Sequence, residues 1–252
     1  MANEPRIPRQ PGTPVQKTLG LIGGMSWEST VPYYREINLA VKEQLGGLHS
    51  AKIVLYSVDF AEIAQLQASG QWQAAGTLLA NVAQKLEGAG AQALVLCTNT
   101  MHKVADAITS SVNIPLLHIA DPTAQAIKEA GYTKVGLLGT RFTMEQDFYR
   151  SRLEIRHGLT VLTPPAPERA QVHQIIYDEL CLGKIKEASR QAYLHIIAAM
   201  QAQGAQAIIL GCTEIGLLVQ PQDCSVPLFD TTTLHARSAA LWAMTASPAE
   251  AA

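Results

Sequence analysis

The sequence predicts an α/β protein of two pseudo-symmetric lobes, each built around a parallel β-sheet and related to the other by an internal duplication. Two observations predict this fold. Continuous apolar runs alternate with helical patterns along the chain, which is typical of parallel sheets covered by helices on both faces. In addition, Gly-Ala-Gln-Ala-Leu-Val-Leu at 90–96 returns as Gly-Ala-Gln-Ala-Ile-Ile-Leu at 204–210. Such self-similarity indicates two copies of one structural unit.

The first copy starts with the apolar run 18–24, which we interpret as a buried strand that ends in a Gly-Gly loop. The helix expected next carries Tyr33, Ile37 and Val41 on one apolar face. The other elements expected in this half are strand 52–59, helices 60–67 and 72–86, a strand beginning at 90, helix 101–108 and strand 114–118.

The second copy follows the same order. Asp121 followed by Pro122 predicts a helix start, with Asp121 as the N-cap. The elements expected after it are strand 134–140, helix 142–157, strand 159–162, helices 168–180 and 184–203, strands 207–211 and 226–230, and helix 234–244.

These elements suggest a division of the chain into parts. We expect the first lobe at 18–119 and the second at 120–230, with a C-terminal helix at 231–247 packing back on the first lobe. Residues 1–17 contain a proline at every third position from Pro5 to Pro14, which predicts a disordered, polyproline-like tail.

The composition narrows the class of protein. Hydrophobic residues make up 48% of the 252 positions and charged residues 16%, and the net charge of −2 gives no reason to expect a nucleic-acid or membrane partner. No apolar run approaches the roughly 20 residues of a membrane span. The chain shows no secretory signal, so its four cysteines indicate reduced thiols and a cytoplasmic location.

The two repeated strands each end in a polar cluster. Pairing Gly90 with Gly204 places Thr98, rather than Cys97, opposite Cys212. Cys212 lies between a buried strand and the expected start of a short helix, where a helix N-terminus would lower the pKa of a thiol. The alternative is that Cys212 is simply a small buried hydrophobic residue.

Strand alternation decides between Cys97 and Thr98. Successive side chains of a strand point to opposite faces. If Cys212 faces a cleft, Thr98 faces it as well and Cys97 points into the core. For Cys181 and Cys224 we expect packing or surface positions.

Asn99, Thr100, Thr213 and Glu214 follow the two strand ends, where amides and hydroxyls could hold a carboxylate. The alternative is ordinary capping of helices by Thr and Asn. Because the chain contains no Cys-x-x-Cys pair, metalloprotease motif or phosphate-binding loop, it predicts no metal or nucleotide site.

Four motifs resemble the aspartate/glutamate racemase family. They are Gly-Leu-Ile-Gly-Gly-Met-Ser-Trp-Glu-Ser-Thr at 20–30, Tyr-Tyr-Arg-Glu-Ile-Asn at 33–38, Thr-Asn-Thr-Met-His at 98–102 and Gly-Cys-Thr-Glu at 211–214. Within the family the chain is most similar to L-aspartate/glutamate-specific or broad-specificity amino-acid racemases. The resemblance implies an aspartate/glutamate racemase-like fold, no cofactor, no metal and a homodimer.

The resemblance also implies a racemisation site for a small-molecule amino acid. Two acid/base groups flank the substrate α-carbon in this family, and the matching positions here are Thr98 and Cys212. Fixed donors must stabilise the carbanion between them, because an amino-acid α-proton is very weakly acidic. The substrate-binding residues implied are Met25, Ser26, Gln67, Asn99, Thr100, Glu179, Thr213 and Glu214.

The chain departs from the family at two places. Most members have Cys where this chain has Thr98, and a threonine hydroxyl is a poor base. We therefore predict an enzyme that works well on one enantiomer, the L form. Aspartate racemases bind the distal carboxylate of the substrate with basic residues. The matching positions here carry Gln67 and Glu179, which favours a neutral amino acid, or a range of amino acids, as substrate.

Two alternatives stay open from the sequence. One is a cofactor-independent decarboxylase or isomerase of the same superfamily, which uses a single catalytic Cys. The other is a two-lobed amino-acid binding protein that has lost catalysis, in which Thr98 stands where a catalytic Cys was replaced.

Overall fold

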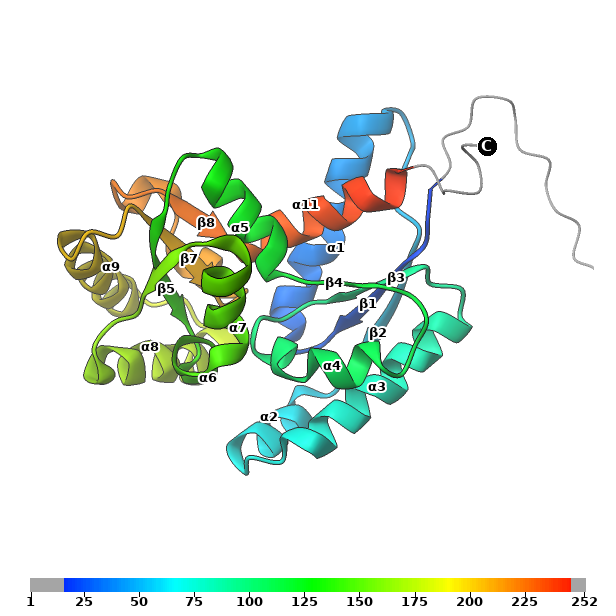
Figure 1. Ribbon diagram of the computed structural model, residues 1–252, viewed down its shortest axis with the longest axis horizontal. Coiled ribbons are helices and arrows are strands. Elements are labelled where there is room, and N and C mark those ends of the chain that lie inside the picture. The colour runs from blue at the N-terminus through cyan, green and yellow to red at the C-terminus, as the bar shows by residue number, and fades with distance from the viewer. Residues whose placement is uncertain (1–15, 246–252) are drawn as a thin grey trace, which may run out of the picture.

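The computed structural model of the chain describes residues 16–245. It contains two four-stranded parallel sheets with the strand orders β2-β1-β3-β4 and β6-β5-β7-β8 (Figure 1). The two orders are equivalent if β1 corresponds to β5, β2 to β6, β3 to β7 and β4 to β8. The predicted α/β fold class, with two pseudo-symmetric parallel sheets, is confirmed. Residues 1–15 of the expected tail lie outside the described part of the chain.

The first lobe, as we use the term, is the first sheet with its helices. Leu19 of the central strand pairs with Ile53 on one side and with Ala93 on the other. Its strands are β1 (Leu19–Gly23), β2 (Ile53–Ser57), β3 (Ala93–Leu96) and β4 (Leu116–Leu117). Its helices are α1 (Trp27–Leu45), α2 (Phe60–Ala68), α3 (Trp72–Gly88) and α4 (Ala105–Thr109).

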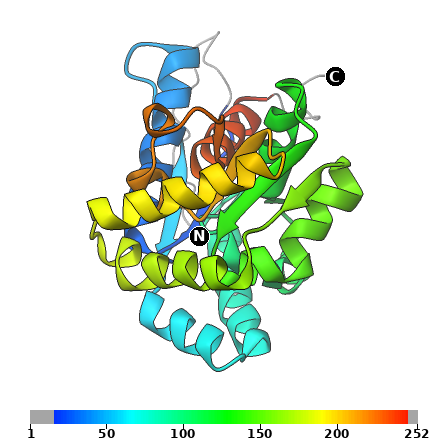
Figure 2. The ribbon, with the colours of Figure 1, turned by 90° about the vertical axis from the view of Figure 1, so that its left-hand side faces the viewer.

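The second lobe repeats this plan. Val135 of its central strand pairs with Val161 and with Ala207. The strands are β5 (Lys134–Gly139), β6 (Thr160–Leu162), β7 (Ala207–Gly211) and β8 (Leu228–Asp230). The helices are α5 (Ala120–Glu129), α6 (Arg141–Glu145), α7 (Asp147–Ser151), α8 (Ala166–Asp178), α9 (Glu187–Ala202) and α10 (Ile215–Leu218). Figure 2 shows α8 and α9 side by side on one face of this lobe.

Each sheet is covered on both faces by apolar side chains. Leu94 and Leu96 of β3 pack with α3, whereas Val95 of β3 and Cys97, the residue after this strand, belong to the cluster formed with α1 and α11. Cys97 is fully buried in that cluster, so the prediction that it points into the core is confirmed. The same alternation leaves Thr98, the next residue, free to reach the carboxyl end of the sheet.

The chain passes twice between the lobes. The first passage leads from β4 into α5, and the second leads from β8 into α11 (Thr231–Met244). In Figure 1, α5 lies between the two sheets, whereas α11 starts there and runs along the first lobe, where it packs against α1. The Lys17 amide donates to the Ala243 carbonyl, which ties the start of the described chain to the end of this helix.

Two local expectations were wrong. The single helix expected at 142–157 is instead α6, α7 and a π-helical turn (Arg152–Arg156), with extended backbone at Gln146. The break lets Met144 pack on one face of the second sheet and Tyr149 on the other. Asp121 is not an N-cap, because α5 starts one residue earlier and the Asp121 carboxylate pairs with Arg152.

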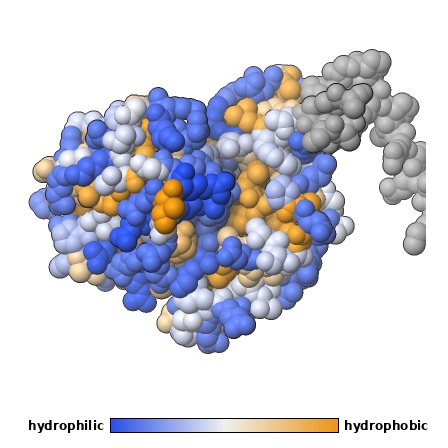
Figure 3. Space-filling model, viewed as in Figure 1, coloured by the Kyte–Doolittle hydropathy of each residue, from blue (hydrophilic) through white to orange (hydrophobic). Residues whose placement is uncertain are grey.

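The surface seen in Figure 3 is largely hydrophilic, with smaller apolar patches. Within residues 16–245, the structure has no helix with both the length and the apolar character needed to cross a membrane.

Candidate active site

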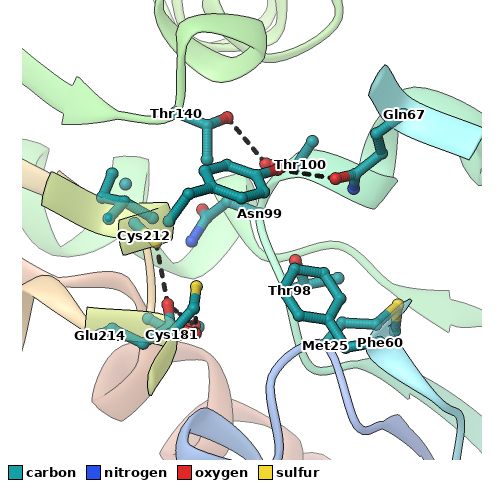
Figure 4. A pocket seen from close by; sticks show the side chains of 14 residues that line it. Met25, Phe60, Gln67, Thr98, Asn99, Thr100, Thr140, Cys181, Cys212 and Glu214 are labelled. Carbon is teal, nitrogen blue, oxygen red and sulfur yellow. Dashed lines mark hydrogen bonds between the residues drawn. The ribbon is translucent and has the colours of Figure 1, made fainter. Parts of the chain in front are cut away.

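The carboxyl ends of β3 and β7 meet at one cavity between the lobes (Figure 4). Thr98 follows β3 and Cys212 follows β7, and both side chains line this cavity. Other sequence-predicted residues that line it are Met25, Gln67, Asn99, Thr100, Thr213 and Glu214. The remaining lining residues are Phe60, Thr140, Ile176, Tyr177, Cys181 and Gly211. The duplication therefore brings its two strand-end motifs to a shared space.

Cys212 and Glu214 are hydrogen-bonded to each other in the wall of the cavity. The Cys212 thiol donates to Glu214 Oε2 at 2.9 Å. Burial raises the pKa of Cys212 well above its ordinary value, and the negative charge of Glu214 raises it further. The expectation that a helix N-terminus lowers this pKa was wrong, because α10 has only four residues and burial dominates. Cys212 is a protonated thiol until a base takes its proton.

The Glu214 carboxylate is buried, with an exposed fraction of 1%. Its Oε1 accepts from Ser26 Oγ at 2.8 Å and its Oε2 accepts from Thr213 Oγ1 at 2.8 Å. A weaker contact runs from Cys181 Sγ to Oε1 at 3.7 Å. Both carboxylate oxygens thus accept hydrogen bonds from neutral donors of the protein, and one of these donors is the Cys212 thiol.

Thr98 and its neighbours form the opposite wall. In Figure 4, Thr98, Met25 and Phe60 lie on one side of the cavity, and Cys212 and Glu214 lie on the other. The two catalytic candidates therefore approach the cavity from different lobes.

Asn99 and Thr100 complete the first strand end. Asn99 Nδ2 donates to Thr231 Oγ1 at 2.9 Å, while its buried Oδ1 has no partner among residues 16–245. Thr100 Oγ1 lies 2.9 Å from Thr140 Oγ1, so hydroxyls from both lobes meet here. An unpaired amide oxygen beside a hydroxyl cluster suits the ammonium and carboxylate groups of an amino acid.

Gln67 and Tyr177 bridge the lobes at another edge of the cavity. Tyr177 Oη donates to Gln67 Oε1 at 2.7 Å, and its ring stacks on Phe60 with centroids 6.2 Å apart. Burial raises the Tyr177 pKa above its ordinary value, which keeps the hydroxyl protonated and able to donate.

The free space inside the cavity is about 20 Å³, enough for roughly one water molecule. Any amino acid therefore requires this bridge or its surroundings to move.

Two sequence-predicted residues do not reach the cavity. Ser26 lies behind Glu214 and acts on it through the hydrogen bond already described. Glu179 is not among the lining residues, and its carboxylate accepts from Ser189 Oγ at 2.6 Å and Lys186 Nζ at 3.1 Å. Ser189 lies in α9 and Lys186 directly precedes it, so these two bonds keep the Glu179 carboxylate against the start of α9. The geometry therefore does not support the expected contact between Glu179 and the substrate.

Tyr177 and Cys181 were missed by the sequence reasoning, which placed Cys181 in a packing or surface position. Both follow the second strand of the second lobe, on or just after α8. In the first lobe, Phe60 and Gln67 line the cavity from α2, which likewise follows the second strand. The internal repeat could have indicated them, because the helix after the second strand lines the cavity in each lobe.

The cavity is poor in charge. Among residues 16–245, its lining includes one carboxylate, that of Glu214, and neither Lys nor Arg. Within the described residues, no group of three or more His, Cys, Asp or Glu side chains is placed to hold a metal ion.

Comparison with known proteins adds independent findings. A model of the Asp/Glu/hydantoin racemase family matches residues 22–239. The crystal structure of a putative Asp/Glu racemase from Yersinia pestis is 63% identical, with a TM-score of 0.84 over 91% of this chain and 100% of that one. An aspartate racemase homologue from Pyrococcus horikoshii is 34% identical, with a TM-score of 0.78 over the same shares.

A curated relative matches a shorter part of the chain. The glutamate racemase of Persephonella marina is 30% identical over 131 residues, which are 51% of this chain and 48% of that protein. The chain thus matches about half the length of this relative.

Proposed function

This chain belongs to the Asp/Glu/hydantoin racemase family, and from that premise we propose that it is an amino-acid racemase that inverts the α-carbon by proton transfer. The observation that carries the proposal is the placement of Thr98 and Cys212 at equivalent strand ends of two lobes, across one cavity. Racemisation removes a proton from one face of a planar carbanion and returns one to the other. A two-lobed site supplies a group for each face.

In the proposed reaction, Glu214 makes Cys212 basic. The proton of the Cys212 thiol passes to Glu214 along the 2.9 Å hydrogen bond, and the thiolate takes the substrate α-proton. The negative charge moves from carboxylate to sulfur, so no new charge is created in a buried site. Ser26 and Thr213 keep the carboxylate aimed at the sulfur.

Thr98 serves the other face. Its hydroxyl relays a proton to the carbanion from a water molecule, which leaves hydroxide on that side. After the product leaves, water that enters the cavity carries the proton of Glu214 to this hydroxide, which restores water, the Glu214 carboxylate and the Cys212 thiol. The α-carboxylate of the substrate is held by hydroxyls and backbone amides of the two strand ends, which stabilise the charge that develops there. The ammonium group is placed at the unpaired Asn99 Oδ1.

We propose a neutral polar amino acid as the preferred substrate, within a range that includes aspartate and glutamate. The names of the relatives point to acidic substrates. A distal carboxylate would, however, meet a cavity whose lining holds no Lys or Arg and one fixed negative charge. Gln67, Tyr177 and Thr140 offer neutral hydrogen-bonding groups instead.

The test is α-proton exchange in deuterated water across a panel of L- and D-amino acids, with the Cys212→Ser variant as control. We expect deuterium incorporation and loss of optical activity for some members of the panel, and a loss of about 10²–10⁴-fold in the variant. A Cys212→Ser variant with full activity would contradict the mechanism. Tight binding without exchange would instead favour a lapsed binding protein.

A single thiol at the site also suits a decarboxylase or isomerase. Cys212 has no sulfur counterpart at Thr98, and one acid/base thiol is sufficient to protonate a carbanion formed by loss of CO₂. Release of CO₂ from a malonate-type acid, or isomerisation of maleate, without exchange of any amino acid α-proton, would support that alternative.

We propose further that the enzyme is a cytoplasmic homodimer. The four cysteines are free thiols, which fits a reducing compartment. Trp27, Val31 and Tyr34 expose more than half of their surface along one stripe of α1, the pattern of a helix that packs against a second copy. Sedimentation analysis of the full chain and of a Trp27→Ser variant tests the dimer, and a monomeric full chain would exclude it.

A further inference from the structure

His102 lies behind Thr98, on the side away from the cavity. It sits in a 3-10 turn (Thr100–Val104) and is buried. Its Nδ1 lies 2.8 Å from the Thr98 carbonyl oxygen, and its Nε2 accepts from the Ile119 amide at 3.2 Å. A peptide N–H can only donate, so Nε2 must carry no proton. The ring is therefore the neutral Nδ1–H tautomer, and Nδ1 donates to the Thr98 carbonyl.

The surroundings of His102 favour this neutral form. The ring of His118 on the β4 side lies 4.3 Å away and that of His235 on α11 lies 6.1 Å away. Burial, these two histidines and the positive charge of Arg152 lower the pKa of His102 well below its ordinary value. The nearby carboxylate of Asp121 is already paired with Arg152 and His157. Only the hydrogen bond to the Thr98 carbonyl opposes this lowering of the pKa, and it is outweighed.

The two partners of His102 belong to different parts of the machinery. Thr98 is the proposed proton donor, whereas Ile119 directly precedes α5, where the chain first passes between the lobes. The second passage is tied to the same loop, because Asn99 Nδ2 donates to Thr231 Oγ1, which in turn donates to the Leu210 carbonyl. The loop that carries Thr98 is therefore hydrogen-bonded to both passages between the lobes.

We propose that His102 is a positioning residue that fixes the Thr98 peptide against the first passage between the lobes, so that the Thr98 hydroxyl keeps its direction into the cavity when the lobes separate to admit substrate. This inference rests on the proposed racemase function. It assigns a defined role to each ring nitrogen. A histidine that only filled space in the core would not need a specific hydrogen bond at each ring nitrogen.

Three variants separate the roles of the two nitrogens. An Asn side chain places its amide near the Nδ1 position, so His102→Asn keeps the bond to Thr98. A Gln side chain reaches the Nε2 position, so His102→Gln keeps the bond to Ile119 and loses the bond to Thr98. His102→Ala loses both. His118→Asn is the matched control, since His118 makes its hydrogen bond to the Ala120 amide rather than to the Thr98 loop.

The readout is kcat and KM for the best amino acid of the panel. We expect kcat to fall about 10–100-fold in His102→Ala and His102→Gln, the cost of a displacement of about 1 Å at a reacting group. The KM changes less than about threefold, and His102→Asn recovers most of the lost kcat. Equal losses in the Asn and Gln variants, or a control that loses as much as His102→Ala, would overturn the proposal.

A second measurement does not depend on activity. Nuclear magnetic resonance of the full chain reports the tautomer of His102 and the resonances of the Thr98 methyl group and the Asn99 amide. We expect an Nδ1–H tautomer, and Thr98 and Asn99 resonances that move in the Gln variant and return in the Asn variant. An Nε2–H tautomer in the unaltered protein would overturn the inference. If no amino acid on the panel reacts, the proposed function fails while this measurement still decides the positioning.

Discussion

The Cys212 thiol and the buried Glu214 carboxylate are joined by a hydrogen bond of 2.9 Å, in a pocket where Glu214 has no salt-bridge partner within residues 16–245. The carboxylate both raises the pKa of the thiol and offers the nearest acceptor for its proton. A neutral residue at position 214 removes both effects, and two different measurements report them.

We expect Glu214→Gln to make Cys212 more acidic and the enzyme slower. Loss of the negative charge lowers the thiol pKa, although burial keeps it above its ordinary value. Loss of the acceptor removes the proton transfer and lowers kcat by about 10²–10⁴-fold. The pH dependence of alkylation by iodoacetamide measures the first effect, and α-proton exchange measures the second. Glu179→Gln, outside the cavity, is the control, and an equal loss there would remove the special role of Glu214.

We predict that Thr98 makes the rates of α-proton exchange unequal for the two enantiomers. Cys212 can be made basic through Glu214, whereas a threonine hydroxyl is too weak an acid to become a base near neutral pH. We expect exchange into the L enantiomer to exceed exchange into the D enantiomer, and Thr98→Cys to raise the slower rate. Initial rates of deuterium incorporation from each pure enantiomer measure this ratio. Equal rates in the unaltered enzyme would contradict the asymmetry.

The bond between Tyr177 and Gln67 favours the closed arrangement of the lobes. Tyr177→Phe removes it while keeping the stack on Phe60, at a cost of about 0.5–1.5 kcal/mol. Because this bond must yield before an amino acid can enter the cavity, its loss corresponds to a fall in KM of about 2–10-fold, which steady-state kinetics will measure. Tyr132→Phe, with its ring against Phe229 and away from the cavity, is the matched control. Identical KM values for the two variants would exclude a role for the bridge.

The sequence predicted those parts of the site that follow from the two-residue alternation of strands and from the internal duplication. Strand alternation distinguishes Thr98 from Cys97, and the duplication pairs Thr98 with Cys212. The positions of Tyr177 and Cys181 depend instead on how far α8 leans over the carboxyl end of its sheet, which side-chain packing decides. The pKa of Cys212 was predicted in the wrong direction, because the length of α10 and the burial of Glu214 arise only in the folded chain.

Close packing beneath Cys212 makes Gly139 sensitive to substitution. A Cβ atom at Gly139 would lie 2.7 Å from the Gly211 carbonyl oxygen, a backbone atom of the neighbouring strand. We expect Gly139→Ala to lower the free energy of unfolding by about 1–3 kcal/mol, as measured by urea denaturation. Gly88→Ala is the control, because its Cβ would meet no atom within 4 Å. Comparable losses in both variants would show that the contact with Gly211 is not the cause.

The buried histidines behind the site make stability depend on pH. Burial lowers the pKa of His235 from 6.5 to about 4. The unfolded chain therefore binds a proton more readily than the folded chain, so the stabilisation is complete above about pH 6.5 and is lost as the pH falls toward 4. His102 and His118 act in the same direction, since their pKa values are lowered as well. We expect the free energy of unfolding to decrease steadily from pH 7 to pH 4.5 in urea titrations. His235→Gln has one such group fewer, so its slope is smaller, and an unchanged slope in that variant would assign the acid sensitivity to other groups.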